Sequence, residues 1–314
     1  MLVNFPARAS DAKIVFDSGR GEHGSKIYVM NADGAVTGPI GSLPGGHADP
    51  KFSPDNRHIV FTYYAPGISG AQIYVMNADG SQPYALTSSP NTKRAPQFTQ
   101  GSRIVYWQNP GSPSSPWVLY NMESDGSHQV PLSFNISGNI ADVSIGNNGM
   151  AAFAGSFVKG DSHETAQIYV ASINGTGLRR LTDSPDTFSS PGWSPDSRKL
   201  AYANQGTWSP VFSNIVAGHD QDGIHIMNAD GSNAKRIARI DFSKEFGPPR
   251  SFPAGGRHVV YMCGSPSFSP DGGMLTYAVN LGEKCQIYLV NLDGSGLKRL
   301  THPPSRSANP SFSH

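Results

Sequence analysis

The sequence predicts an all-β protein, a six-bladed β-propeller of four-stranded antiparallel blades that is closed by its C-terminal strand. Three observations lead to this prediction. A motif that reads IYVMNADG at 27–34 occurs six times, the same companion patterns surround each copy, and the chain ends on a strand pattern that its beginning lacks. Turn-rich repeats of this length with short β-forming runs are typical of propellers.

The repeated motif predicts the third strand of each blade. Its copies are Ile27–Gly34, Ile73–Gly80, Leu119–Gly126, Ile168–Gly175, Ile224–Gly231 and Ile287–Gly294. Each copy is a short run of β-forming residues that ends in Asp-Gly or Asn-Gly, and this dipeptide allows the positive φ angles of a tight hairpin. The spacing between copies grows along the chain, which indicates loop insertions rather than additional repeats.

Three further patterns predict the other strands of a blade. A Pro-x-aromatic triplet such as Pro50–Phe52 marks the first strand, and an apolar run such as His58–Phe61 marks the second. A run such as Arg180–Thr182 marks the fourth. The fourth blade departs from this pattern, because Val143–Ile145 stands where the triplet is expected. Each unit therefore reads as four antiparallel strands linked by turns.

The two ends of the chain are expected to complete one blade together. The chain begins at a second-strand pattern, Lys13–Phe16, and ends on an unaccompanied first-strand pattern, Asn309–Ser313. We therefore expect residues 309–313 to pair beside 13–16. Such pairing covers an exposed strand edge and ties both ends of the chain into one sheet.

The Pro-x-aromatic-Ser-Pro-Asp, IYVMNADG and Arg-Leu-Thr signatures resemble the WD40-like (PD40) repeat of TolB-like six-bladed β-propellers. The resemblance covers essentially the whole chain and implies the propeller fold. It implies no single function, because propellers of this type include periplasmic scaffolds, parts of serine peptidases and several carbohydrate lyases. TolB itself carries an α/β domain ahead of its propeller. Since the repeats begin at once here, we expect that domain to be missing.

We expect a single domain over residues 1–314, because a ring of blades grows by adding modules that pack on their neighbours. One segment, 241–264 between blades five and six, does not fit the repeat. Within it, residues 249–261 imitate a first and a second strand, but no third-strand motif follows. We interpret the segment as an inserted hairpin over one face, with the remnant of a seventh blade as the alternative.

The composition excludes some classes of function. Charged residues make up 15% of the chain and the formal net charge is +1, so we expect no nucleic-acid partner. The sequence has no run of 18 apolar residues that would form a membrane span. The N-terminus lacks a signal-peptide pattern, which predicts a cytoplasmic protein if this end is native and a periplasmic or secreted one if it is processed.

The two cysteines leave the compartment open. Cys263 and Cys285 are expected at the same edge of blade six, two strands apart. Two strand spacings are roughly 10 Å, whereas a disulfide needs Cα atoms within about 7 Å. The sequence therefore allows a disulfide but does not imply one.

The two faces of the predicted propeller differ. One carries the short turns inside the Ser-Pro-Asp and Asn-Ala-Asp-Gly patterns. The other, which we call the variable-loop face, carries longer loops of unlike sequence, such as 17–26, 63–71 and 205–222. Because binding sites are commonly built on variable loops of a rigid scaffold, we place the functional site on this face.

Three histidines of the variable-loop face are candidate catalytic residues that we expect in one pocket. His23 belongs to blade one, His47 leads into blade two, and His302 leads into the closing strand. Imidazole titrates near neutral pH and can act as a general acid or base. No closely spaced pair of histidines indicates a metal ion, and we expect neither a metal nor a cofactor. Ordinary solvated loop histidines are the alternative.

Seven further residues are candidates for ligand binding. Asp49 and Arg306 neighbour the three histidines, and Arg94 can hold a carboxylate through two parallel hydrogen bonds. The blade-five loop combines an aromatic side chain with titratable groups. The full set is Asp49, Arg94, His163, Trp208, His219, Asp220 and Arg306. Solvated loop residues, or packing within the blade-five loop, are the alternatives.

Two classes of function fit these residues. The first is a non-catalytic scaffold that binds a protein, a small molecule or a glycan on the variable-loop face. It is favoured because the sequence contains no nucleophile triad, phosphate-binding loop or spaced metal motif. The second is an enzyme built from scattered loop residues, either a polysaccharide or oligouronide lyase that uses His, Tyr and Arg, or a cofactor-free cyclase.

Overall fold

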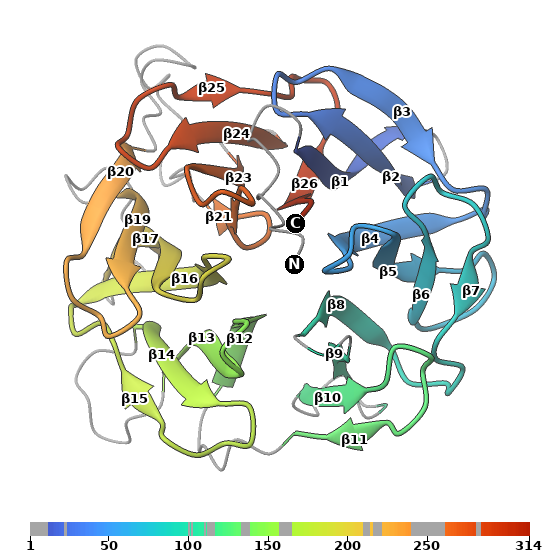
Figure 1. Cartoon of the computed structure of the whole chain (residues 1–314), viewed down its shortest axis with the longest axis horizontal. Helices are drawn as coiled ribbons and strands as arrows, with labels where there is room; N and C mark the ends of the chain where they lie inside the picture. The colour runs from blue at the N-terminus through green and yellow to red at the C-terminus, as the bar shows by residue number, and fades with distance from the viewer. Residues whose placement is uncertain are drawn as a thin grey trace, which may run out of the picture.

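The inner strands of six antiparallel sheets surround a central channel (Figure 1). The computed structural model describes residues 12–21, 24–99, 101, 103–109, 111, 117–132, 139–156, 165–209, 214–215, 222–239, 261–280 and 284–314. All regular secondary structure in these ranges is β-strand. The predicted fold, a six-bladed β-propeller, is confirmed.

Each blade runs from an inner strand at the channel to an outer strand at the rim. Blade one consists of β26 (Ser307–Phe312), β1 (Lys13–Gly21), β2 (Gly24–Asn31) and β3 (Val36–Ile40). Blade two consists of β4 (Gly46–Phe52), β5 (His58–Tyr64), β6 (Gln72–Asn77) and β7 (Tyr84–Ala85). Blade three consists of β8 (Lys93–Phe98), β9 (Ile104–Gln108), β10 (Val118–Met122) and β11 (Val130–Pro131).

The second half of the ring repeats this order with two additions. Blade four consists of β12 (Asn139–Ile145), β13 (Met150–Ser156), β14 (Gln167–Ser172) and β15 (Arg179–Arg180). Blade five consists of β16 (Asp186–Trp193), β17 (Lys199–Ser209), β19 (Gly223–Asn228) and β20 (Lys235–Arg239), and β18 (Asn214–Ile215) pairs with the end of β17. Blade six consists of β21 (Tyr261–Met262) and β22 (Ser267–Phe268), which both pair with β23 (Met274–Asn280), then β24 (Cys285–Asn291) and β25 (Lys298–Arg299).

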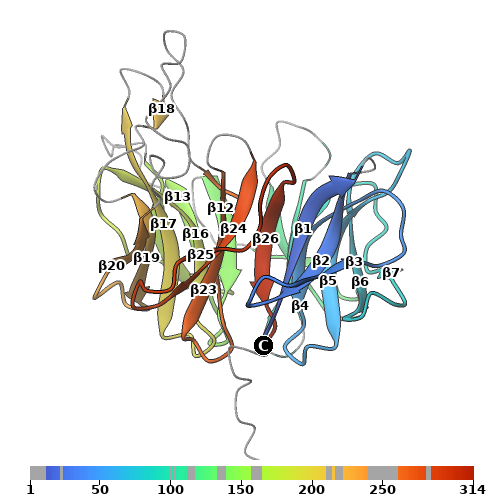
Figure 2. The same ribbon diagram turned by 90° about the horizontal axis from the view of Figure 1, so that it is seen from above.

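The C-terminal strand closes the ring as predicted. β26 pairs antiparallel with β1, with Ile14 opposite Phe312. The strand then continues toward blade two, where His314 N donates a hydrogen bond to Asn56 Oδ1 at 2.6 Å and Asn56 Nδ2 donates one back to His314 O. The C-terminus lies at the face opposite to the one from which β18 projects (Figure 2). β26 therefore runs from the variable-loop face to the face of short turns.

The glycine of the third-strand motif is required by the packing of neighbouring blades. Gly126 has a φ of 87°, and a Cβ atom added there would lie 2.5 Å from the carbonyl oxygen of Leu86 in blade two. Gly294 has a φ of 89°, and its added Cβ would lie 2.9 Å from the carbonyl oxygen of Ile237 in blade five. Any larger residue would clash with backbone as well as adopt an unfavourable conformation. The repeated turn thus fixes the contact between blades.

The two cysteines form a disulfide within blade six, with Cα atoms 6.1 Å apart. The separation of roughly 10 Å expected from two strand spacings was wrong. Cys263 follows the end of β21, where the pairing with β23 shifts before β22 begins, so regular strand spacing does not apply there.

The segment 241–264 is described only at its end. Tyr261 and Met262 pair with Asn280 and Val279 of β23, so this part belongs to the sheet of blade six. Residues 241–260 lie outside the described part of the chain, and the inserted hairpin remains a prediction. No helix among the described residues is long and apolar enough to cross a membrane.

Candidate functional site

The inner strands enclose a channel with a volume of about 1470 Å³. In five of these strands the pairing shifts at one residue of left-handed backbone conformation, with φ between 51° and 54°. These bulge residues are Asp49, Ala95, Asp142, Ser190 and Asn309. A β-bulge redirects the side chain that follows it, so the repeat sends equivalent residues of different blades toward the channel.

Two of the bulge residues are aspartates that join neighbouring blades. Asp49 Oδ2 accepts hydrogen bonds from Thr62 Oγ1 at 3.0 Å and from the backbone N–H of Ala95 in blade three at 3.1 Å. Asp142 Oδ2 accepts hydrogen bonds from the backbone N–H and the hydroxyl of Ser190 in blade five, at 3.2 and 3.1 Å. Both carboxylates therefore hold adjacent inner strands together.

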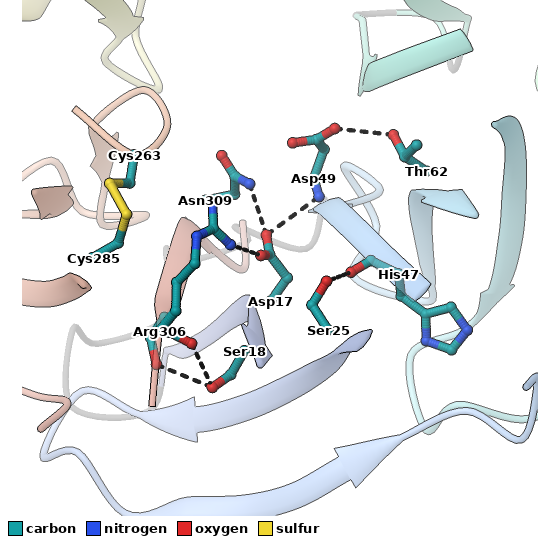
Figure 3. Close-up of polar contacts among 11 residues, drawn as sticks. Asp17, Ser18, Ser25, His47, Asp49, Thr62, Cys263, Cys285, Arg306 and Asn309 are labelled. Carbon is teal, nitrogen blue, oxygen red and sulfur yellow. Dashed lines mark hydrogen bonds and ion pairs between the residues drawn. A yellow bond between two sulfur atoms is a disulfide. The ribbon is translucent and has the colours of Figure 1, made fainter. Parts of the chain in front are cut away.

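Asp17 is a third channel carboxylate, at the seam between the closing strand and blade two (Figure 3). Its Oδ2 accepts a hydrogen bond from Arg306 Nη1 at 2.9 Å. Its Oδ1 accepts one from Asn309 Nδ2 at 2.7 Å and a longer one from the backbone N–H of Asp49 at 3.4 Å. The Asp17 side chain is buried, whereas 46% of the Arg306 side chain is exposed. Arg306 is thus fixed through one nitrogen, and much of its side chain remains accessible.

Burial and charge act in opposite directions on Asp17. Burial and the nearby charge of Asp49 raise its pKa to about 6, against the opposing effects of the hydrogen bond from Asn309 and the charge of Arg306. Desolvation dominates because the carboxylate has lost contact with water. Asp17 therefore titrates close to neutral pH although it is paired with an arginine.

Arg94 lies where blade three meets the variable-loop end of the channel. Its guanidinium carbon is 4.0 Å from the centre of the Trp117 ring, a cation–π contact. Tyr64, which is 46% exposed, also lines the channel, and its pKa is raised by burial and by Asp49 and lowered by Arg94. Tyr64, Asp49 and Arg94 all line the channel, and Asp49 accepts a hydrogen bond from Ala95, the residue that follows Arg94.

The two described histidines of the predicted catalytic set lie outside this cluster. His47 is 1% exposed and packs against Phe61 and Tyr63, with ring centroids 5.4 and 5.5 Å away. Both of its ring nitrogens are buried and have no hydrogen-bond partner among the described residues, and burial and Lys26 lower its pKa to about 4. The ring points away from Asp17 and Asp49 (Figure 3). His302 is exposed, and neither histidine lines the channel.

Of the other predicted site residues, some line the channel and some lie outside the described part of the chain. Asp49, Arg94 and Arg306 all line the channel. His23, His163, His219 and Asp220 lie outside the described residues, and of Trp208 only the backbone in β17 is described. The common histidine pocket therefore remains a prediction. Within the described ranges, no group of three or more His, Cys, Asp or Glu side chains is arranged to hold a metal ion.

Sequence analysis missed four residues of the site, namely Asp17, Lys51, Tyr64 and Trp117. A signal for Asp17 was available. Asp17 and Thr62 are polar residues in second strands, at positions where blades four and five carry Ala154 and Ala203. A polar residue in place of a buried apolar one indicates a specific partner.

Solved structures share this fold at low sequence identity. TolB from Acinetobacter baumannii is 16% identical with a TM-score of 0.67, and the match covers 96% of this chain and 66% of TolB. Hydrazine synthase from Kuenenia stuttgartiensis is 15% identical with a TM-score of 0.65, covering 96% of this chain and 46% of that one. Oligogalacturonate lyase from Vibrio parahaemolyticus is 12% identical with a TM-score of 0.52, and the match covers 94% of this chain and 73% of the lyase chain.

A match in sequence also exists. An uncharacterized protein of Agrobacterium fabrum is 25% identical over 164 residues, which is 47% of this chain and 55% of that protein. The chain thus spans about half the length of this relative and 66% of TolB. No protein-family model matches the chain. At these identities the likeness establishes the fold, a TolB-like six-bladed β-propeller, and the function has to be argued from the site.

Proposed function

We propose that this TolB-like propeller is a non-catalytic binding module, and that it takes an organic anion at the variable-loop end of its central channel. The observation that carries the proposal is an imbalance of hydrogen bonding among the charged residues of the channel wall. Acidic side chains of the wall have their partners within the protein. Among the basic side chains of the wall, Arg94 and Arg306 have N–H donors available for a ligand.

The acids of the channel wall already accept hydrogen bonds from within the protein. Asp17, Asp49 and Asp142 accept the bonds described above, and Asp55 accepts from Ser53 Oγ at 2.5 Å and from the backbone N–H of Arg57 at 3.0 Å. A cation entering the channel would have to compete with these bonds. The wall therefore favours a ligand that supplies acceptors rather than donors.

The basic side chains are less occupied. Arg94 makes its contact with the Trp117 ring, and among the described residues it forms no ion pair. Arg306 uses Nη1 for Asp17 and remains half exposed. A guanidinium has five N–H donors and binds carboxylates through two parallel hydrogen bonds. These two arginines support recognition of an acidic group.

The aromatic side chains beside Arg94 support an organic anion over an inorganic one. Tyr64 and Trp117 both line the channel next to the arginine. Binding sites for organic ligands commonly combine aromatic surfaces with a few charged groups. A uronic acid or another ring-bearing carboxylate would place its apolar face on these side chains. The disulfide between Cys263 and Cys285 supports a location in an oxidising compartment.

A lyase is the second candidate function, and one observation favours it. Asp17 has a pKa of about 6 and is hydrogen-bonded to Arg306, so a proton-transfer group lies next to a residue suited to neutralise a substrate carboxylate. An oligogalacturonate lyase shares the fold. The side chain of Asp17 is buried, however, so a substrate would reach Arg306 first.

Both candidates are tested by one titration with oligogalacturonates. Tryptophan fluorescence reports binding, because Trp117 lies beside Arg94, and ultraviolet absorbance of the same samples reports any unsaturated product. We expect saturable quenching with flat absorbance. We expect Arg94→Gln to weaken binding by about tenfold or more, since charge-assisted hydrogen bonds contribute about 1.5 to 3 kcal/mol.

The matched control is Arg198→Gln, which removes an exposed arginine from the face of short turns. It should bind as the wild-type protein does. If the two variants lose affinity equally, the site is not at Arg94. A rise in absorbance that depends on protein concentration would replace the binding module by the lyase.

A further inference from the structure

One residue of each first strand forms a ring around the interior of the channel. It is the residue that precedes the aromatic position of the Pro-x-aromatic pattern. The six residues are Lys51, Gln97, Ser144, Gly192, Ser267 and Ser311, and all of them line the channel. The ring is uncharged except at Lys51.

Most members of this ring join one blade to the next. Three side chains bond to the inner strand of the following blade. The bonds are Gln97 Nε2 to Ile145 O at 3.0 Å, Trp193 N to Ser144 Oγ at 3.4 Å, and Phe312 N to Ser267 Oγ at 3.1 Å. At Gly192 the neighbouring backbone takes the place of a side chain, because an added Cβ would lie 2.1 Å from the carbonyl oxygen of Pro266. The position is therefore generally structural.

Lys51 does not take part in this linkage. In the part of the chain that the structure describes, its ammonium group forms no hydrogen bond and no ion pair. Asp17 and Asp49 are close enough to attract its charge, but both carboxylates have the hydrogen bonds described above. Lys51 is half-buried and lines the channel. Three N–H donors are thus available to a molecule inside the channel.

Burial makes an unoccupied ammonium group costly at this place. It lowers the pKa of Lys51, and Asp49 and Asp17 oppose that shift. A charged group that is partly removed from bulk water and lacks a direct partner within the protein gains from a bound counter-ion. An anionic group of a ligand would supply the missing acceptors.

We propose that Lys51 is a second anion subsite, inside the channel, and that the ligand is a small organic dianion with one acidic group at Arg94 and the other at Lys51. The two residues come from adjacent inner strands, β8 and β4. The inference rests on the proposed function, since Arg94 is the first subsite. It adds the interior position and the second charge of the ligand.

Calorimetric titration with acetate and with linear dicarboxylates from succinate to sebacate tests this proposal. We expect the wild-type protein to bind one dicarboxylate length at least about tenfold more tightly than acetate. Lys51→Met should remove that advantage and leave the affinity for acetate unchanged. Lys51→Arg should retain it, because a guanidinium also supplies donors.

Two further variants separate this proposal from the one on which it rests. Arg94→Gln should weaken the binding of acetate and of dicarboxylates alike. Lys235→Met, at an exposed position on the outer strand β20, should change the affinity for neither ligand. Melting temperatures establish that each variant is folded. If dicarboxylates bind Lys51→Met as tightly as wild type while Arg94→Gln loses both ligands, the second subsite is wrong and the proposed function stands. If the wild-type protein binds no carboxylate, the proposed function fails as well.

Discussion

The two halves of the channel wall share one strand framework but use their side chains differently. Asp49 in blade two and Asp142 in blade four occupy the same bulge position, and each carboxylate bonds to the next blade. Two residues further along, blade two has Lys51, whose side chain forms no hydrogen bond among the described residues, whereas blade four has Ser144, whose side chain is bonded to blade five.

This difference shows where function is added to a repeat. In blades four to six, side chains that line the channel form contacts with the neighbouring blade. In blades one to three, Asp49 and Gln97 also make such contacts, but Arg306, Lys51 and Arg94 add basic side chains that line the channel. Since the inner strands of blades one to five share the same bulge, the difference between them comes from their side chains.

The largest expected effect comes from opening the ring. Deleting Ser307–His314 removes the inner strand of blade one, including Phe312, which is 1% exposed, and uncovers Ile14 and Phe16. Loss of one buried phenylalanine alone costs about 3 to 5 kcal/mol. We expect the melting temperature to fall by more than about 10 °C, as measured by calorimetry. An unchanged melting temperature would contradict closure by β26.

The next largest effect is expected from substitutions at the residue that precedes the aromatic position, which is Gly192 in blade five and Lys51 in blade two. Gly192→Ala should destabilise the protein by about 2 to 3 kcal/mol, because its Cβ would overlap the carbonyl oxygen of Pro266. Lys51→Ala should cost less than about 1 kcal/mol, since Lys51 links no blades. Urea unfolding of both variants measures the difference. Equal losses would show that Lys51 is structural after all.

The smallest effect concerns the pH dependence of stability at the seam. The pKa of Asp17 is raised to about 6, mainly by burial, so the folded protein holds this proton more tightly than the unfolded chain. Its contribution to stability is complete at low pH and is lost as pH rises through about 6. Relative to Asp17→Asn, the wild-type protein should gain about 1 kcal/mol between about pH 7 and about pH 5.

The comparison with Asp17→Asn is needed because His47 acts in the opposite direction. Burial lowers its pKa to about 4, so the unfolded chain takes up a proton on His47 before the folded protein does. This contribution destabilises the fold as pH falls, and both proteins share it. Urea midpoints that change with pH by the same amount in both proteins would refute the assignment to Asp17.

The fold was predictable from the sequence because each level of the repeat agrees with the others. The Asp-Gly turns, the Pro-x-aromatic strands and the incomplete blade at the two ends all required the same closed ring. The turn glycines even encode the contact between blades, as at Gly126. What the repeat does not encode is the interruption between β21 and β22 in blade six, and the disulfide at Cys263 depends on it.

The site was predictable only in part, for a reason that lies in the bulges. His47 and Asp49 are two residues apart in β4, so a regular strand would direct both side chains to the same side. The pairing shifts after Ala48, so Asp49 lines the channel while His47 is buried between Phe61 and Tyr63. Loop position alone therefore did not separate His47 from Asp49, whereas Asp49, Arg94 and Arg306 line the channel and the pocket of three histidines remains a prediction.

The central claim is that donors from blades one to three bind an organic anion in the channel. Crystals grown with 4-bromobenzoate test it most directly, because anomalous scattering from bromine locates the ligand without ambiguity. The account predicts one bromine site within the channel, with the carboxylate hydrogen-bonded to Arg94 and the ring against Trp117 or Tyr64. Bromine sites confined to the outer rim, or placed against Asp142 and Ser190 in the other half of the wall, would contradict it.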